Sequence, residues 1–259
     1  MTLAVAVLGL GEAGGTIASG LAAEGCDVRG WDPDPARVVV DVERTASPTE
    51  AVAAADLVLS LATAAHALDA ATGVVSTLGA SQLYADLNTT APALKREVAA
   101  AIAGSGAAFA DVALLRGVPA RGVGTPALAS GDGAERFAEL VRPLGMPVEV
   151  VGSEPGDAAG LKLLNSVFMK GLAAAVIESV EAASRRGAGD WLRGEIAEVI
   201  GEPLLERLLS GSVTHAERRR DEMDAAAAYV HELGVEPRVA EAAAGWLGQL
   251  ADEKRARPA

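Results

Sequence analysis

The two halves of the chain have different hydrophobic patterns. Through about residue 155, short apolar runs alternate with stretches of helical periodicity, and the remainder shows helical periodicity only. Short runs that are apolar at nearly every position are typical of parallel strands covered on both faces. The pattern predicts an α/β protein: a Rossmann-type, doubly wound, mostly parallel sheet in residues 1–155, followed by an all-helical domain in residues 156–259.

The expected elements follow from apolar runs, caps and glycine or proline boundaries. Strands are predicted at residues 3–8, 27–31, 56–61, 82–87, 107–112, 126–130 and 147–151, with helices at 13–24, 48–55, 65–78, 92–103 and 134–144. In the second half, helices are predicted at 157–186, 190–200, 203–209, 213–233 and 238–255.

The first predicted strand runs directly into a glycine motif. The turn reads Gly9-Leu10-Gly11-Glu12-Ala13-Gly14, a helix follows it, and the next strand ends at Asp32. In a chain with 29 glycines the motif alone is weak, but strand, glycine turn, helix, strand and acid together are the context of a dinucleotide site. Residues Gly9, Leu10, Gly11, Glu12 and Ala13 are therefore predicted to line the cofactor, with its phosphates at the helix N-terminus.

Asp32 bears on the choice of cofactor. A carboxylate at this position accepts hydrogen bonds from ribose hydroxyls and repels a 2′-phosphate, which favours NAD over NADP. Arg29 and Arg37 are close in sequence, so NADP stays possible. Asp32 could also cap the helix that the Asp-Pro-Asp-Pro segment would start.

In a doubly wound sheet, ligands lie beyond the carboxyl ends of the strands. Leu61, Ala62 and Thr63 follow one predicted strand and Asn88 follows another, so all four are predicted to contact the cofactor. The segment Asn88-Thr89-Thr90 could contact the nicotinamide or substrate from this strand end, or equally cap the helix that begins at Pro92.

Composition narrows the range of functions. A formal net charge of -13 argues against nucleic-acid or anionic-membrane partners. The single cysteine, Cys26, excludes an internal disulfide and fits a reducing compartment, and the three scattered histidines suggest no metal site. No apolar run reaches membrane-spanning length and the N-terminus leads straight into a strand, so we expect a cytoplasmic protein.

The predicted helix at 157–186 carries an unusual polar stripe. Lys162, Ser166 and Lys170 are spaced four residues apart and so share one face of an otherwise apolar helix. Farther along, His215, Arg219 and Glu222 share a helix face, which is either an anion-binding surface or a solvated one.

Four stretches of this chain resemble the β-hydroxyacid dehydrogenases, which include the 3-hydroxyisobutyrate and 6-phosphogluconate dehydrogenases. They are the glycine turn, Asp86-Leu87-Asn88-Thr89-Thr90-Ala91-Pro92, the loop from Asp111 to Gly124-Thr125, and the stretch from Gly156 to Lys162 followed by Asn165-Ser166. The resemblance is closest to a 6-phosphogluconate dehydrogenase-like branch that has its own C-terminal helical domain.

The chain also departs from the family pattern. Where the family has Pro-Val-Ser-Gly-Gly, this chain has Ala113-Leu114-Leu115-Arg116-Gly117, so the serine that holds the substrate carboxylate is missing. Ser166 replaces the second asparagine after the lysine. The reaction is therefore better supported than the substrate.

The resemblance implies an NAD(P)-dependent oxidoreductase acting on a small β-hydroxy acid, with Lys162 as general acid and base. Burial beside a cationic nicotinamide and near Lys170 would lower the pKa of Lys162 toward the working pH. Ser166 and Lys170 would complete the catalytic group. The implied contacts of the small anionic substrate are Leu115, Arg116, Thr125, His215 and Arg219.

Two alternatives stay open. One is an imine, enamine or keto reductase with the same cofactor site, and the other is a non-catalytic dinucleotide-binding protein. The family also implies a homodimer in which each C-terminal domain helps to cover the partner's cleft.

Overall fold

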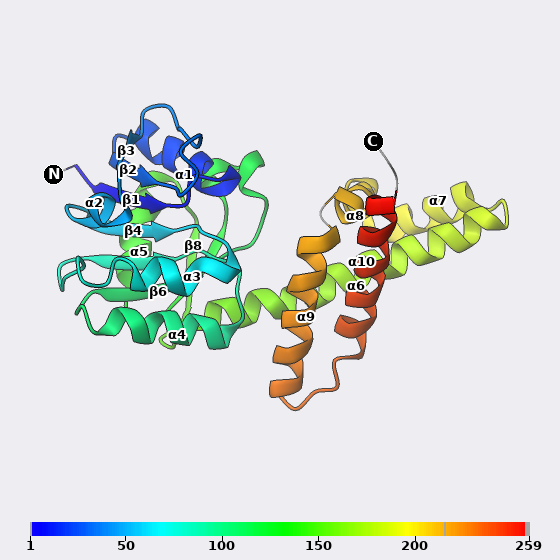
Figure 1. Cartoon of the computed structure of the whole chain (residues 1–259). Coiled ribbons are helices and arrows are strands. Elements are labelled where there is room, and N and C mark those ends of the chain that lie inside the picture. The colour runs from blue at the N-terminus through cyan, green and yellow to red at the C-terminus, as the bar shows by residue number, and fades with distance from the viewer. Residues whose placement is uncertain (1, 215, 257–259) are drawn as a thin grey trace. The chain divides into compact units, whose positions relative to one another are not determined.

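The computed structural model describes residues 2–214 and 216–256. These form two compact units, an N-terminal unit of Met1–Lys162 and a C-terminal unit of Leu163–Ala259 (Figure 1). The domain boundary between residues 155 and 156 stays a prediction.

The N-terminal unit is built on a single eight-stranded sheet with the order β3-β2-β1-β4-β5-β6-β7-β8. All neighbouring strands are parallel except the β6–β7 pair, which is antiparallel. The strands are β1 (Ala4–Leu8), β2 (Asp27–Trp31), β3 (Glu43–Arg44), β4 (Leu57–Ser60), β5 (Leu83–Asp86), β6 (Ala108–Leu114), β7 (Ala127–Ser130) and β8 (Val148–Gly152).

Helices cover both faces of this sheet, as the apolar strands predicted (Figure 1). One core contains the apolar faces of α1 (Glu12–Ala23) and α5 (Ala134–Val141). The other contains those of α2 (Pro48–Val52), α3 (Ala67–Thr72) and α4 (Pro92–Ala103). Short 3-10 turns occupy Ala64–His66, Val118–Ala120, Gly122–Gly124 and Arg142–Leu144. This is the doubly wound arrangement, with its switch point between β1 and β4.

In the N-terminal unit, the predicted helices at 48–55 and 65–78 are shorter in the structure, and one strand was missed. The helix expected at 65–78 is shorter, because α3 ends at Thr72 with Gly73 as its C-cap and the chain then forms turns. The edge strand β3 was not predicted, since two polar residues provide no apolar alternation.

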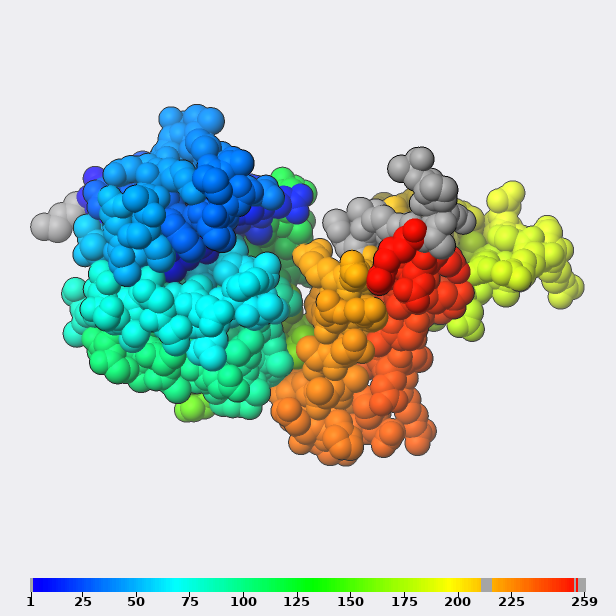
Figure 2. Space-filling model, viewed as in Figure 1, coloured from blue at the N-terminus to red at the C-terminus, as the bar shows by residue number. Residues whose placement is uncertain are grey.

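The C-terminal unit contains only helices among the described residues. They are most of α6 (Asp157–Arg185), which begins in the N-terminal unit, and α7 (Gly189–Ile200), α8 (Glu202–Thr214), α9 (Ala216–Glu232) and α10 (Arg238–Ala256). Helices α9 and α10 lie side by side, and Figure 2 shows them as adjacent orange and red surfaces. The predicted helices at 203–209 and 213–233 had the wrong boundary, because α8 continues through Thr214.

By length and composition, α6 is the one described helix that could cross a membrane. A single such helix is weak evidence, because a core helix passes the same test. Its residues Leu163, Ala173 and Val176 belong to apolar clusters of the C-terminal unit, which gives α6 a packing role.

Candidate functional site

The glycine turn lies between β1 and α1, beside the end of β4. Gly9 has a φ of +99°, and a Cβ there would lie 2.4 Å from the carbonyl oxygen of Leu61. A Cβ on Gly14 would lie 1.8 Å from the Gly9 oxygen, whereas one on Gly11 would meet nothing within 4 Å. The first and third glycines therefore permit close packing, and the second leaves open space at the start of α1.

Asp32 is joined to this turn. Its carboxylate accepts hydrogen bonds from the amide of Leu10 at 2.7 Å and from that of Asp34 at 2.9 Å. Asp32 thus orders the glycine turn and accepts a local hydrogen bond in the turn that follows it, but the helix that it was expected to cap is absent, because the chain forms bends and turns after Asp32.

The arginines that kept NADP possible have acidic partners. Arg29 pairs with Glu43 at 3.3 Å and Arg37 with Asp34 at 3.5 Å. The sequence did not single out Arg44, whose guanidinium donates to the backbone oxygen of Asp32 at 2.8 Å.

The residues at this edge fit a dinucleotide. Helix α1 has Gly11 as its N-cap, with no side-chain hydrogen bond to its first amides, and the space in front of Gly11 is open. Such a helix terminus suits a pyrophosphate. At the end of β5, the buried Oδ1 of Asn88 has no hydrogen-bond partner, so it can accept one from a carboxamide.

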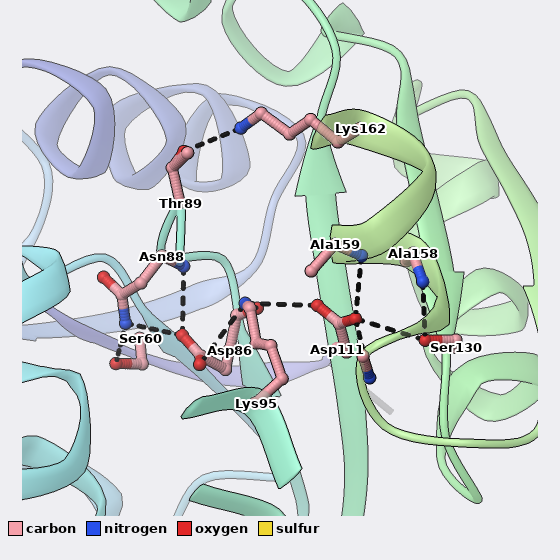
Figure 3. A network of polar contacts seen from close by, with 11 residues as sticks. Ser60, Asp86, Asn88, Thr89, Lys95, Asp111, Ser130, Ala158, Ala159 and Lys162 are labelled. Atoms are coloured by element: carbon pink, nitrogen blue, oxygen red, sulfur yellow. Dashed lines mark hydrogen bonds and ion pairs between the residues drawn. The ribbon is translucent and has the colours of Figure 1, made fainter. Parts of the chain in front are cut away.

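Lys162 contacts the segment that follows β5. Its Nζ donates a 2.6 Å hydrogen bond to Oγ1 of Thr89, the residue after Asn88 (Figure 3). Leu61, Ala62 and Thr63 follow β4, and Thr63 is hydrogen-bonded to His66 at 2.7 Å. Because β4 and β5 are parallel neighbours, these segments lie at the same edge of the sheet.

The predicted substrate loop follows β6. Leu115 is half-buried and Arg116 is exposed, with its guanidinium donating to the Leu115 oxygen. Thr125 is fully buried and its hydroxyl donates to the oxygen of Gly122 at 2.8 Å. The local hydrogen bond of Thr125 holds the loop before β7.

In the C-terminal unit, Ser166 and Lys170 share an acidic partner. The Ser166 hydroxyl donates to Glu222 at 2.5 Å, and the Lys170 ammonium lies 3.0 Å from the same carboxylate oxygen and 3.1 Å from Ser166 Oγ. Burial lowers the pKa of Lys170, and Glu222 partly offsets this. Burial also lowers the pKa of Arg219, again against the effect of Glu222. His215 lies outside the described residues.

Within the described part of the chain, no group of three or more His, Cys, Asp or Glu side chains is placed to hold a metal ion. The groups available for chemistry are the ammonium, hydroxyl and carboxylate groups of the Lys162–Thr89 contact and of the Ser166, Lys170 and Glu222 cluster.

Comparison with known proteins identifies the family. A model of the NAD binding domain of 6-phosphogluconate dehydrogenase matches residues 4–152, over half of the chain. The chain belongs to the β-hydroxyacid dehydrogenase superfamily. A second model, described as a domain of unknown function, matches residues 183–250 in the C-terminal unit. Membership of this superfamily supports a nicotinamide cofactor for the N-terminal unit.

Individual relatives agree with this assignment. The chain is 27% identical over 203 residues to 3-hydroxyisobutyrate dehydrogenase of Pseudomonas aeruginosa, covering 74% of this chain and 68% of that protein. A conserved hypothetical protein from Sinorhizobium meliloti is 30% identical with a TM-score of 0.78, covering 96% and 88% of the two chains. Alignments with the curated relatives span about two thirds of those proteins, 65% in one and 68% in the other.

The fold is also that of a Mycobacterium tuberculosis 3-hydroxyisobutyrate dehydrogenase. The TM-score is 0.82 at 23% identity, and the match covers 97% of this chain and 94% of the other. At that identity the likeness concerns the fold.

Sequence reasoning did not place several of these side chains in the site. Thr89, the partner of Lys162, was noticed as part of a segment that could cap a helix or contact the nicotinamide or substrate, and Glu222, the partner of Lys170, only as part of a polar helix face. The buried residue Lys95 was overlooked altogether. Its signal was a cation on the apolar side of α4, three residues after Pro92.

Proposed function

We propose that the protein is an NAD-dependent oxidoreductase that transfers a hydride between the nicotinamide and a small β-hydroxy acid or its keto form. The observation that supports this most directly is the contact of Lys162 with Thr89, the residue after Asn88, whose buried Oδ1 has no hydrogen-bond partner. An amine that can exchange a proton thus contacts the residue that follows Asn88, whose free oxygen is suited to a carboxamide.

The residues of this chain would divide the work as follows. The glycine turn and the N-terminus of α1 bind the phosphates, Asp32 binds the adenosine ribose, and Asn88 orients the nicotinamide. Bound NAD would supply the hydride acceptor. Lys162 takes the hydroxyl proton when the alcohol is oxidised and returns it when the carbonyl is reduced.

The preference for NAD rests on charge. Asp32 would lie near the ribose, where its carboxylate repels a 2′-phosphate. Arg29 and Arg37 are each paired with an acid, so neither is as available to a phosphate as the sequence alone suggested.

Lys162→Met tests the catalytic assignment. Oxidation would be followed by formation of NADH with 3-hydroxyisobutyrate, L-serine and 6-phosphogluconate as trial substrates. The variant should bind NADH with unchanged affinity while kcat falls about 10²- to 10⁴-fold, the usual contribution of a general acid or base. The matched control is Arg96→Met, which removes an exposed cation from α4. Turnover retained in Lys162→Met would exclude Lys162 as the acid and base.

We also infer a homodimer. Large apolar side chains of α6 are exposed within the single chain, with Phe168 at 65% and Leu161 at 45%. Burying such side chains against a second copy would be favourable. Analytical ultracentrifugation measures the assembly directly, and a monomer at micromolar concentration would contradict the inference.

A further inference from the structure

Three charged side chains are buried together beneath the segment that carries Asn88 and Thr89. Asp86 and Asp111 are 0% exposed and Lys95 is 1% exposed. The Lys95 ammonium donates to the backbone oxygen of Asp86 at 2.7 Å and lies 3.3 Å from the Asp86 carboxylate and 3.2 Å from that of Asp111. Figure 3 shows these contacts as one connected network. Burial of three charges is costly, so the network needs a reason beyond packing.

At one end, the network holds the start of α6. Oδ2 of Asp111 accepts hydrogen bonds from the amides of Gly156 at 3.1 Å and Ala159 at 3.0 Å. It also accepts one from the hydroxyl of Ser130, which in turn accepts from the amide of Ala158 at 3.0 Å. A carboxylate on β6 thus caps α6 from outside the helix, where the helix dipole favours negative charge.

The approach of the backbone tightens this attachment. Gly156 has a φ of +105°, and a Cβ there would lie 3.0 Å from both Cβ and the carbonyl oxygen of Pro92. Pro92 begins α4, the helix that carries Lys95. The first turn of α6 is therefore fixed to α4 and to β6 together.

At its other end, the network holds the segment after β5. Oδ1 of Asp86 accepts hydrogen bonds from the backbone amide of Asn88 at 3.0 Å and from its side-chain Nδ2 at 2.5 Å. The same Nδ2 donates to Ser60 Oγ at 3.1 Å. The Asn88 side chain is thereby oriented with its amide nitrogen toward β4 and β5.

Lys162 and Thr89 form the contact that spans these two ends. Ala158 and Ala159 lie in the turn of α6 that precedes Lys162, and helical side chains extend back over the preceding turn. Thr89 directly follows Asn88 and receives the Lys162 hydrogen bond at 2.6 Å. Lys162 is thus attached through the first turn of α6 to Asp111, and Thr89 is attached through Asn88 to Asp86. The ammonium of Lys95 pairs with both of these carboxylates.

We propose that the Asp86–Lys95–Asp111 network is a positioning device for the reaction: Asp111 and Ser130 set the position of Lys162, Asp86 sets that of Asn88, and Lys95 fixes the two carboxylates relative to each other. This rests on the role proposed above for Lys162. A misplacement of a reacting group by about 1 Å can cost roughly 100-fold in rate, so a buried network can matter without touching substrate.

The variants that test this are Asp111→Asn and Ser130→Ala. Asp111→Asn removes the negative charge that caps α6. Ser130→Ala removes the hydroxyl that accepts from the Ala158 amide and keeps the Asp111 carboxylate, so this variant tests the proposal if Asp111→Asn does not fold. The matched control is Gln82→Met at the other end of β5. Gln82 is also buried and donates to the oxygens of Val52 at 2.7 Å and Ala55 at 2.8 Å, so its loss should reduce stability alone.

The chain has only four lysines, Lys95, Lys162, Lys170 and Lys254, so lysine labelled at Cε and Nζ gives a readable NMR spectrum of the full-length protein. Loss of one signal in Lys162→Arg assigns Lys162. We expect Ser130→Ala and Asp111→Asn to move the Lys162 signal and its pH titration, and Gln82→Met to leave both unchanged. NADH affinity should stay within about twofold while kcat falls about 10- to 100-fold.

Two results would overturn the proposal: an unchanged Lys162 signal in a folded Ser130→Ala variant, or an equal change in Gln82→Met. The spectra need no substrate, so they separate this proposal from the proposed function. If Lys162→Met keeps its turnover while Ser130→Ala still moves the Lys162 signal, the coupling exists and the catalytic assignment fails.

Discussion

Replacing Lys95 with methionine should destabilise the N-terminal unit strongly. Methionine fills a similar volume but leaves Asp86 and Asp111, both 0% exposed, without their shared cation. It also removes the hydrogen bond to the Asp86 backbone oxygen. Removing one partner of a buried ion pair typically costs about 3–5 kcal/mol, which is a large part of the 5–15 kcal/mol stability of an ordinary domain, taken as a rough range.

Urea unfolding can measure this cost in the N-terminal unit alone. Trp31 lies on β2 and packs against the apolar core beneath α2 and α4, so it reports on that unit once Trp191 and Trp246 are changed to phenylalanine. The cost is the shift in midpoint multiplied by the slope m, provided that m is unchanged.

The control for Lys95→Met is the same variant with Asp86→Asn and Asp111→Asn added. Neutral amides remove the uncompensated charges, so most of the lost stability should return. A loss below about 1 kcal/mol in Lys95→Met would refute the reasoning, because it would mean that water or local rearrangement satisfies both carboxylates.

Two further predictions concern other charged groups. Asp32→Asn should lower the ratio of the NADPH Kd to the NADH Kd by about tenfold, because it removes the repulsion of a 2′-phosphate; parallel fluorescence titrations measure this, and an unchanged ratio would exclude Asp32 as the selector. Burial lowers the pKa of Lys170 below its ordinary value of 10.5. Between the lowered pKa and 10.5, the folded state therefore binds fewer protons than the unfolded state, and the contribution of Lys170 to the free energy of unfolding rises with pH. Urea unfolding at successive pH values should show this rise in the wild-type protein and not in Lys170→Met. The raised pKa of Tyr84 affects both proteins equally and so cancels in the comparison. Equal slopes of the free energy of unfolding against pH in the two proteins would contradict the prediction.

The sequence was sufficient wherever the signal is local. The strand Asp27–Trp31 and the helix Pro92–Ala103 have the predicted bounds, since their apolar runs are closed by an acid, a proline or a glycine. The glycine turn was recognisable because its spacing and flanking elements carry the information. The edge strand Glu43–Arg44 was not, because it depends on pairing with β2.

The predicted site was incomplete because its interactions join distant parts of the chain. Lys162 and Thr89 are 73 positions apart, Asp111 and Ala159 are 48 apart, and Ser166 and Glu222 are 56 apart. Residue type and spacing identified Lys162 and Lys170, whereas their partners, and Lys95, depend on how strands and helices pack. No periodicity along the chain records that two acids at neighbouring strand ends share one cation.

The geometry explains why position 95 carries lysine rather than arginine. The three hydrogens of an ammonium group can point to three acceptors around one nitrogen, and Lys95 Nζ has three oxygens within 3.3 Å, two from Asp86 and one from Asp111. A guanidinium presents its donors in a planar fork suited to one carboxylate face, and it is larger. Placed between β5, β6 and α4, it would push Asp86 and Asp111 apart. Since Asp111 caps α6 and Asp86 orients Asn88, a change in their separation would be transmitted to the contact between Lys162 and Thr89.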